Sequence, residues 1–268
     1  MITRLIFVLV AAAAVAGFSS SSAAQRPAPA APSGTQVLSR MRAAYDGVWY
    51  PTLTFIQKTR IHRPDVSVAE QIWHESVRWT AERGAQLRID GGDFAAGNGT
   101  IYTADSAWSV RGGKLAAARP KGNEFLPLIE SVYLQPVERT VREVKLAKVD
   151  LDRTRVAEWH GRPVWVVGTA TASDTTSPQF WVDTARKVVV RMILHDDATS
   201  PVIDVDIDGY EPVGKAWLGT RVMIRAGGRL VQEEIYTDWK ANVALPDALF
   251  DPAQWTTAPH WGKTPPPR

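Results

Sequence analysis

The sequence predicts a mostly β protein, built on one curled antiparallel sheet of about a dozen strands and covered by a few helices. Apolar and polar residues alternate with period two in many short runs, separated by Gly, Pro, Asn or Asp. Helical spacing of apolar residues occurs only near residues 35–46 and 123–146. The strand-helix-strand rhythm of a parallel sheet is missing. Because strand twist accumulates over so many strands, we expect the sheet to curl and to enclose an inner face.

The N-terminal residues predict export from the cytoplasm. Arg4 precedes an uninterrupted apolar run over residues 5–16, and Ser22 and Ala24 place small residues ahead of a cleavage point. This is the pattern of a signal peptide, and the run is too short to span a bilayer. We expect residues 1–24 to be removed and the mature protein to be periplasmic. A membrane anchor or a buried N-terminal helix is the alternative.

The composition excludes several classes of protein. The chain has no cysteine, which excludes disulfides, a thiolate nucleophile and a lipid-modified cysteine. A second long apolar run is absent, so we expect a protein that does not span the membrane. The formal net charge of +3 arises from well-mixed charges without a basic stripe. The sequence therefore predicts no nucleic-acid partner.

The distribution of proline divides the remaining chain into three parts. Residues 25–33 are rich in proline and alanine and predict a flexible tether. Residues 34–256 have the length and patterning of one β domain with a sizeable core. Residues 257–268 end in a run of prolines, and we expect a flexible tail there.

The domain is predicted to begin with one helix and one long hairpin. Apolar residues between 37 and 45 recur at helical spacing, and a glycine ends the run. From residue 49 onward the period changes to two. Leu53 and Phe55 share one face of a first strand, and Trp73, Val77 and Trp79 share one face of a second strand. A proline-aspartate pair between the runs supplies the turn.

The rest of the domain is predicted as further strands interrupted once by helices. The helices are expected over residues 124–134 and 137–146, where apolar residues return to helical spacing. Period-two runs and turn residues place the strands at 86–90, 100–103, 107–110, 155–159, 164–171, 179–182, 188–194, 203–207, 218–225 and 230–239.

The sequence contains no complete motif for metal binding or catalysis. Five histidines are scattered, and no pair has the spacing of a helical metal site. Asp204, Asp206 and Asp208 copy the opening of a calcium loop, but Lys215 stands where a bidentate glutamate is required. We expect these aspartates on the solvated face of a strand, and no metal. The nucleophile-elbow, phosphate-loop and dinucleotide signatures do not occur, so no catalytic residue and no cofactor are predicted.

Four short stretches resemble one known family when they are taken together in order. Residues 55–58 are similar to its opening strand, and residues 105–108 with 112–114 resemble its central hairpin. Residues 122–129 resemble the start of its inserted helices, and residues 248–251 resemble its closing segment. The family is that of the LolA-like periplasmic lipoprotein carriers. The resemblance spans most of residues 35–256.

This resemblance implies a more specific fold and one further residue. The fold would be an incomplete, half-open antiparallel β-barrel covered by helices, which holds acyl chains inside without chemistry. The family has a functional arginine after its second strand, followed by proline. The matching position here is Arg83, but Gly84 follows it, and an exposed turn arginine is the alternative.

The candidate ligand-binding site is an apolar cavity between the sheet and the inserted helices. Eleven tryptophans are compatible with such a cavity. The residues expected to bind ligand are Leu53, Phe55, Trp73, Val77, Trp79, Arg83, Phe125 and Leu128. For each apolar side chain, filling a packed core is the alternative.

Three functions remain open from the sequence. The first is a periplasmic carrier or binding protein for a lipoprotein acyl chain or another lipid, without catalysis, working with an inner- or outer-membrane partner protein. The second is an envelope sensor or protein-docking module that uses an edge of the same curved sheet. The third is a hydrolase with a carboxylate near His74 or His195.

Overall fold

The computed structural model describes residues 31–263, and a single large sheet makes up most of it. The predicted signal peptide and residues 25–30 of the predicted tether lie outside the described residues. The N-terminal half of the sheet contains β1 (Thr52–His62), β2 (Val68–Thr80), β3 (Gly84–Gly91), β4 (Gly99–Tyr102), β5 (Ala107–Arg111) and β6 (Lys114–Arg119). The C-terminal half contains β7 (Thr154–Trp159), β8 (Arg162–Val167), β9 (Gln179–Asp183), β10 (Val189–Leu194), β11 (Ile203–Asp208), β14 (Arg221–Ala226) and β15 (Arg229–Ala241).

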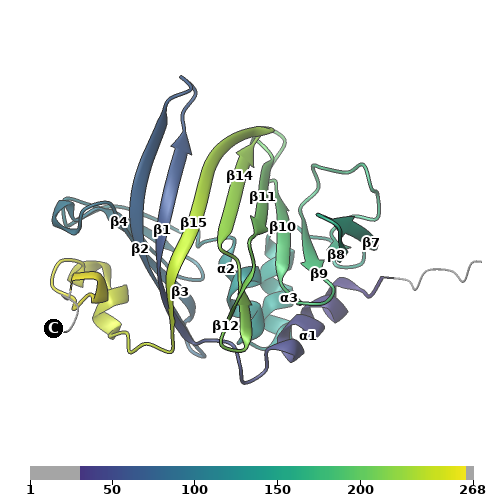
Figure 1. The fold of residues 1–268 in the computed structure, drawn as a ribbon, viewed down its shortest axis with the longest axis horizontal. Coiled ribbons are helices and arrows are strands. Elements are labelled where there is room, and N and C mark those ends of the chain that lie inside the picture. The colour runs from purple at the N-terminus through teal and green to yellow at the C-terminus, as the bar shows by residue number, and fades with distance from the viewer. Residues whose placement is uncertain (1–30, 264–268) are drawn as a thin grey trace, which may run out of the picture.

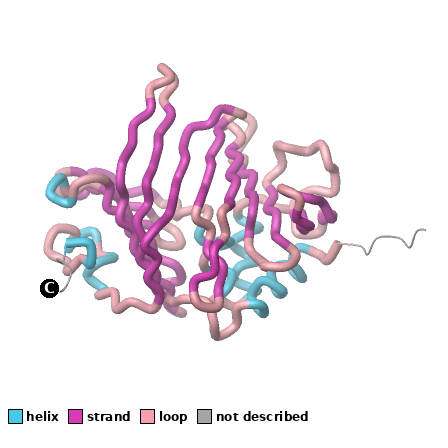
Figure 2. Tube along the Cα trace, in the orientation of Figure 1, coloured by secondary structure: helices cyan, strands magenta, loops and turns pink. Residues whose placement is uncertain are grey.

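The sheet is antiparallel and open. Its thirteen strands are ordered β6-β5-β4-β3-β2-β1-β15-β14-β11-β10-β9-β8-β7. Strands β6 and β7 are the two edges, and within the described residues they do not pair with each other. The sheet curves across its width, and its strands are the dominant feature of the molecule (Figures 1 and 2). The predicted class, a mostly β, half-open antiparallel barrel, is confirmed.

The last strand joins the two halves of the sheet. β15 pairs with β14 on one side and with β1 on the other, from Ile61 opposite Gln232 to Leu53 opposite Ala241. The register shifts between Thr54 and Ile56, near the Leu53 end of this pairing, where Asp238 of β15 has a φ of 57°. An extra residue of this kind bends a strand and increases its twist.

The helices cover one face of this sheet. They are α1 (Gly34–Ala44), α2 (Leu126–Ile129) and α3 (Val137–Leu146), with a 3-10 turn, η2 (Ser131–Tyr133), between α2 and α3. In Figure 1 they lie behind the C-terminal half of the sheet. Ser33 caps α1 in a reciprocal capping box with Gln36, and α1 packs against α3 and η2. None of the helices in residues 31–263 has both the length and the hydropathy of a bilayer-spanning segment.

Several elements differ from the sequence-based expectation. The helix expected over residues 124–134 is broken into α2 and η2, because the backbone of Glu130 leaves the helical conformation, with φ −129° and ψ −61°. The strand expected over residues 218–225 is split by a turn. Its first part pairs in a small separate sheet of β12 (Glu211–Val213) and β13 (Ala216–Leu218). Strand β6 was not expected, since its alanine-rich exposed sequence has no alternation.

The packed part of the chain extends beyond residue 256, where the sequence predicts a flexible tail. Three 3-10 turns, η3 (Asp247–Phe250), η4 (Pro252–Gln254) and η5 (Trp261–Lys263), follow β15, and η1 (Phe94–Ala96) lies between β3 and β4. His260 is buried, with its Nε2 2.9 Å from a carboxylate oxygen of Asp90. The indole of Trp261 donates a hydrogen bond to Ser76 Oγ at 2.9 Å. Residues 257–263, which the sequence placed in a flexible tail, therefore belong to the packed structure, and residues 264–268 lie outside the described part.

Candidate ligand-binding cavity

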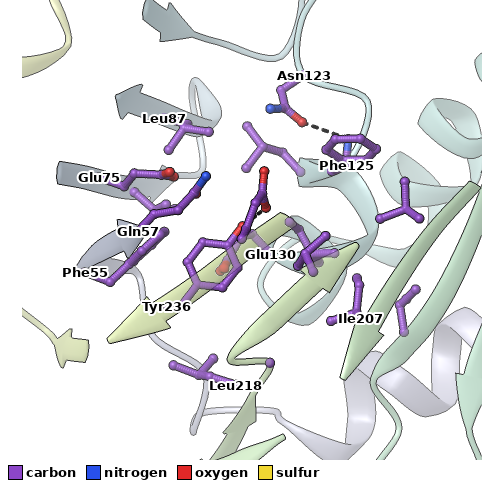
Figure 3. A pocket seen from close by; sticks show the side chains of 18 of the residues that line it. Phe55, Gln57, Glu75, Leu87, Asn123, Phe125, Glu130, Ile207, Leu218 and Tyr236 are labelled. Carbon is purple, nitrogen blue, oxygen red and sulfur yellow. Dashed lines mark hydrogen bonds between the residues drawn. The ribbon is translucent and has the colours of Figure 1, made fainter. Parts of the chain in front are cut away.

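A cavity of about 380 Å³ lies between the inner face of the sheet and the helical segment 123–133 (Figure 3). Ligand sites in proteins commonly have volumes of about 300–1,000 Å³, so this space suits one small molecule or one chain of a lipid. Most of its walls are apolar or aromatic. The lining comes from β1, β2, β3, β4, β10, β11, β13, β14, β15 and the helical segment. It includes Phe55, Val77, Leu87, Ile89, Phe125, Leu126, Ile129, Met192, Val205, Ile207, Leu218, Val222 and Ile224.

Aromatic side chains of the central strands form one wall. The ring of Phe55 in β1 lies 4.2 Å from Trp239 and 5.3 Å from Tyr236, measured between ring centroids. Tyr236 and Trp239 are three residues apart in β15, and in a regular strand they would point to opposite faces. The extra residue at Asp238 turns both side chains toward the cavity.

The opposite wall is made by the helical segment and the residues after α1. The side-chain oxygen of Asn123 accepts a hydrogen bond from the backbone N–H of Phe125 at 2.9 Å, which fixes the start of α2 (Figure 3). Trp49 packs against Tyr133 with 3.9 Å between ring centroids. The aromatic packing of Trp49 therefore holds the helical wall to the chain between α1 and β1.

The structure places the eight predicted ligand-binding residues at three different locations. Phe55, Trp73, Val77 and Phe125 line the cavity. Leu53, Trp79 and Leu128 do not line it and instead belong to, or pack against, the surrounding apolar core, which was the stated alternative for them.

Arg83 does not line the cavity either. It lies in the turn between β2 and β3, where its backbone N–H donates to Thr80 Oγ1 at 3.1 Å. It borders a separate, polar surface depression together with Glu82 and Asp247. This position is the turn that the sequence offered as the alternative for Arg83.

Three glutamates in the cavity wall were not selected from the sequence. Glu75 of β2, Glu130 between α2 and η2, and Glu234 of β15 are all at least nine-tenths buried. The sequence could have indicated Glu75, because alternate residues of a strand share one face. Glu75 therefore lies on the same inner face as Trp73 and Val77. A charged residue at a core position of an alternating strand is uncommon and indicates a special environment.

The hydrogen bonding of the three carboxylates differs. Glu130 accepts a hydrogen bond from the indole of Trp49 at 3.0 Å. Glu234 accepts hydrogen bonds from the Tyr236 hydroxyl and the Gln232 amide. Glu75 is buried and its Oε1 has no hydrogen-bond partner in the described structure. In Figure 3, Glu75 and Gln57 point side by side from the strands into the cavity.

Burial changes the protonation of these groups. Removal from water raises the pKa of Glu130 to about 8, against the opposing effect of the Trp49 hydrogen bond. Burial also raises the pKa of Glu75 well above its usual range, and the nearby Glu234 raises it further. The pKa of Glu234 is raised by burial and held down in part by its hydrogen bonds. The described residues lining the cavity include no lysine, arginine or histidine that could neutralise these groups.

The aspartates on the outer face do not form a metal site. In residues 31–263, no three His, Cys, Asp or Glu side chains are arranged to hold a metal ion. The expectation that Asp204, Asp206 and Asp208 all face water is wrong for Asp206, which is only 5% exposed. Its carboxylate lies 3.4 Å from Trp159 Nε1 and 3.4 Å from His160 Nε2, because the β7–β8 hairpin packs over this strand. Asp204 pairs with Arg191 at 2.7 Å.

Comparison with known proteins identifies the fold. The sequence matches no protein-family profile and no curated protein. A putative outer membrane lipoprotein-sorting protein domain from Vibrio parahaemolyticus superposes with a TM-score of 0.58, covering 83% of this chain and 98% of its own, at 10% identity. The chain has a LolA-like fold. A LolA superfamily protein from Nitrosomonas europaea agrees, with a TM-score of 0.50 over 82% of this chain and 98% of its own, at 11% identity.

The LolA-like fold is shared with a protein of the DUF1329 family from Desulfovibrio piger. That structure superposes with a TM-score of 0.56, covering 81% of this chain and 95% of its own, at 13% identity. All three similarities extend over most of both chains. At these identities the likeness establishes the LolA-like fold, and it does not transfer a ligand.

Proposed function

We propose that the protein is a periplasmic carrier or binding protein that holds one acyl chain of a lipoprotein, or another lipid, in the cavity without catalysing a reaction. The observation that supports this most directly is the apolar and aromatic cavity between the sheet and the helices. The signal sequence supports the compartment. The LolA-like fold supports the class, since one similar structure is described as a lipoprotein-sorting protein domain.

Burial of an acyl chain provides enough free energy for such binding. Each buried methylene contributes about 0.8 kcal/mol, so about ten methylenes contribute about 8 kcal/mol. Lost translational and rotational freedom opposes this by several kcal/mol. A reversible complex is the expected result, which suits a carrier that must also release its cargo.

The chemistry of the lining supports binding over covalent catalysis. The described lining residues include no serine, threonine, cysteine or lysine to serve as a nucleophile and no histidine to serve as its base. His74, considered from the sequence as a partner for a carboxylate, lies outside the cavity and packs against Phe94 and Trp261. A partner protein in the inner or outer membrane would deliver or accept the cargo.

The proposal is tested by binding of an environment-sensitive apolar dye to delipidated protein, followed by displacement with acyl ligands. Val77→Glu places an unpaired carboxylate in the cavity wall, and we expect the dye affinity to fall by about tenfold or more. Val68→Glu is the matched control, because Val68 lies on the same strand but is 44% exposed. It should bind the dye as the parent does.

A second variant keeps the test possible if Val77→Glu does not fold. Ile224 lines the cavity and is only half-buried, so Ile224→Trp fills part of the space with an apolar ring. We expect weaker dye binding with an unchanged circular dichroism spectrum. If the folded parent binds neither dye nor acyl ligands, and Val77→Glu only unfolds the protein, the interior is a packed core. The envelope sensor or docking module is then the better account.

A further inference from the structure

We propose that the cavity selects an amphiphile whose head group is a protonated amine, and that Glu75 and Glu234 bind this head group. The inference rests on the proposed function, because it assumes that the cavity binds an amphiphile. It adds the chemical class of the head group and the residues that recognise it. A ligand with an anionic head group, such as a fatty acid, is disfavoured at the same place.

The strand register brings the two glutamates to the same part of the inner face. Glu75 of β2 lies opposite Phe55 of β1, and Glu234 of β15 lies opposite Thr59 of β1. Gln57 lies between these two positions on β1 and is a diagonal neighbour of both glutamates. The result is a polar spot in a wall that is otherwise aromatic and aliphatic.

The hydrogen bonding of this spot is incomplete without a ligand. Glu75 is only 4% exposed, and its Oε1 finds no partner among the described residues, although it faces the cavity. Glu234 accepts hydrogen bonds from Tyr236 and Gln232 and is also bonded to Gln57, and a carboxylate with about four lone-pair positions still has acceptor capacity left. An ammonium group has three donors and no acceptor, which matches two neighbouring carboxylates.

The charge of the cavity points to the same head group. Glu75, Glu130 and Glu234 all line it, and the described lining has no basic side chain. Buried carboxylates are costly unless they are paired, and an apolar residue at each position would serve a purely hydrocarbon cargo better. A cationic ligand favours the ionised form of these carboxyl groups and provides its counter-charge, so that their protons leave as the ligand binds, whereas a carboxylate or phosphate ligand opposes this ionisation.

The test compares three ligands of equal chain length, dodecylamine, dodecanol and dodecanoate, as competitors of the bound dye at neutral pH and below micelle formation. We expect dodecylamine to displace the dye at concentrations about tenfold or more lower than dodecanoate, because its ammonium group forms charge-assisted hydrogen bonds with Glu75 and Glu234 as they ionise. Dodecanol, which is neutral, should lie between them. The parent protein and all variants are used as full mature chains.

Isosteric variants assign the preference to the two residues. Glu75→Gln together with Glu234→Gln should abolish the advantage of dodecylamine over dodecanol. Glu233→Gln is the matched control, because Glu233 neighbours Glu234 in β15 but pairs with Arg60 and His62 instead of lining the cavity. It should keep the preference of the parent. The single variant Glu75→Gln gives a second measurement if the double variant does not fold.

The outcomes separate this inference from the proposed function. If all three ligands displace the dye equally well, or if the preference persists in the double variant, the head-group inference is overturned while the cavity remains a lipid site. If the folded parent binds neither the dye nor any ligand, the proposed function fails first.

Discussion

Glu130 shows how one buried residue couples this fold to pH. It lies between α2 and η2, where it is 7% exposed and accepts a hydrogen bond from Trp49. Its pKa is raised from 4.5 to about 8, so the folded protein holds a proton there that the unfolded chain has lost at neutral pH. Proton binding by Glu130 in the folded protein therefore adds to the free energy of unfolding. This contribution is complete below about pH 4.5 and is lost as the pH rises through about 8. Glu75 and Glu234 also make the folded protein less stable as the pH rises, because burial raises both of their pKa values.

Glu130→Gln should therefore flatten the pH dependence of stability. Glutamine keeps the shape and an acceptor for the Trp49 indole but cannot lose a proton. We expect the free energy of unfolding of the variant, relative to the parent, to increase by a few kcal/mol between pH 5 and pH 8. Urea unfolding followed by tryptophan fluorescence at several pH values measures this. Parallel curves for variant and parent would contradict the assignment.

Residue identities alone could indicate part of the site. Phe55, Trp73 and Val77 were predicted because alternation fixes which face of a strand they occupy, and that face proved to be the inner one. Alternation cannot tell whether such a residue borders empty space or another side chain, so Leu53 and Trp79 were assigned to the cavity as well. The burial of Asp206 was missed for a related reason, since it depends on the distant hairpin β7–β8.

At the scale of elements, the long hairpin β1–β2 and the helices α1 and α3 followed from local pattern. They have strong periodicity and clear ends, which is where sequence reasoning is most reliable. The C-terminal turns were missed because they are held by distant partners. One such partner is Arg88 of β3, which is fully buried and pairs with Asp90 at 2.7 Å. Its guanidinium group donates hydrogen bonds to the carbonyl oxygens of Leu249 and Trp255 and stacks on the Trp255 ring.

Arg88→Met should loosen this C-terminal segment. The change leaves the Asp90 carboxylate without its arginine and removes two hydrogen bonds to the segment, and we expect a loss of about 3 kcal/mol in stability. Limited proteolysis should then cut within residues 245–263 before the rest of the chain. Arg111→Met is the matched control, because Arg111 is exposed on β5 and should change little. Equal stability of both variants would show that the segment is not held by Arg88.

At the scale of the whole molecule, the sequence predicted a curled sheet with helices over its inner face but not the order of its strands. The placement of β15 between β1 and β14 joins residues far apart in the chain, and no local pattern specifies such a pairing. The cavity is a property of this arrangement. It exists because the broken helix α2–η2 and the curved strands leave space that Phe125, Phe55 and their neighbours border without filling.

Native mass spectrometry of the protein, expressed in bacteria and purified without detergent, tests the existence of a lipid-binding interior most directly. We expect a fraction of the protein to carry one bound amphiphile, released on unfolding and identified in the same experiment, and expect Val77→Glu to reduce this fraction strongly while Val68→Glu does not. A folded parent that is always free of ligand, and that takes up neither dye nor lipid when these are added, would contradict the account.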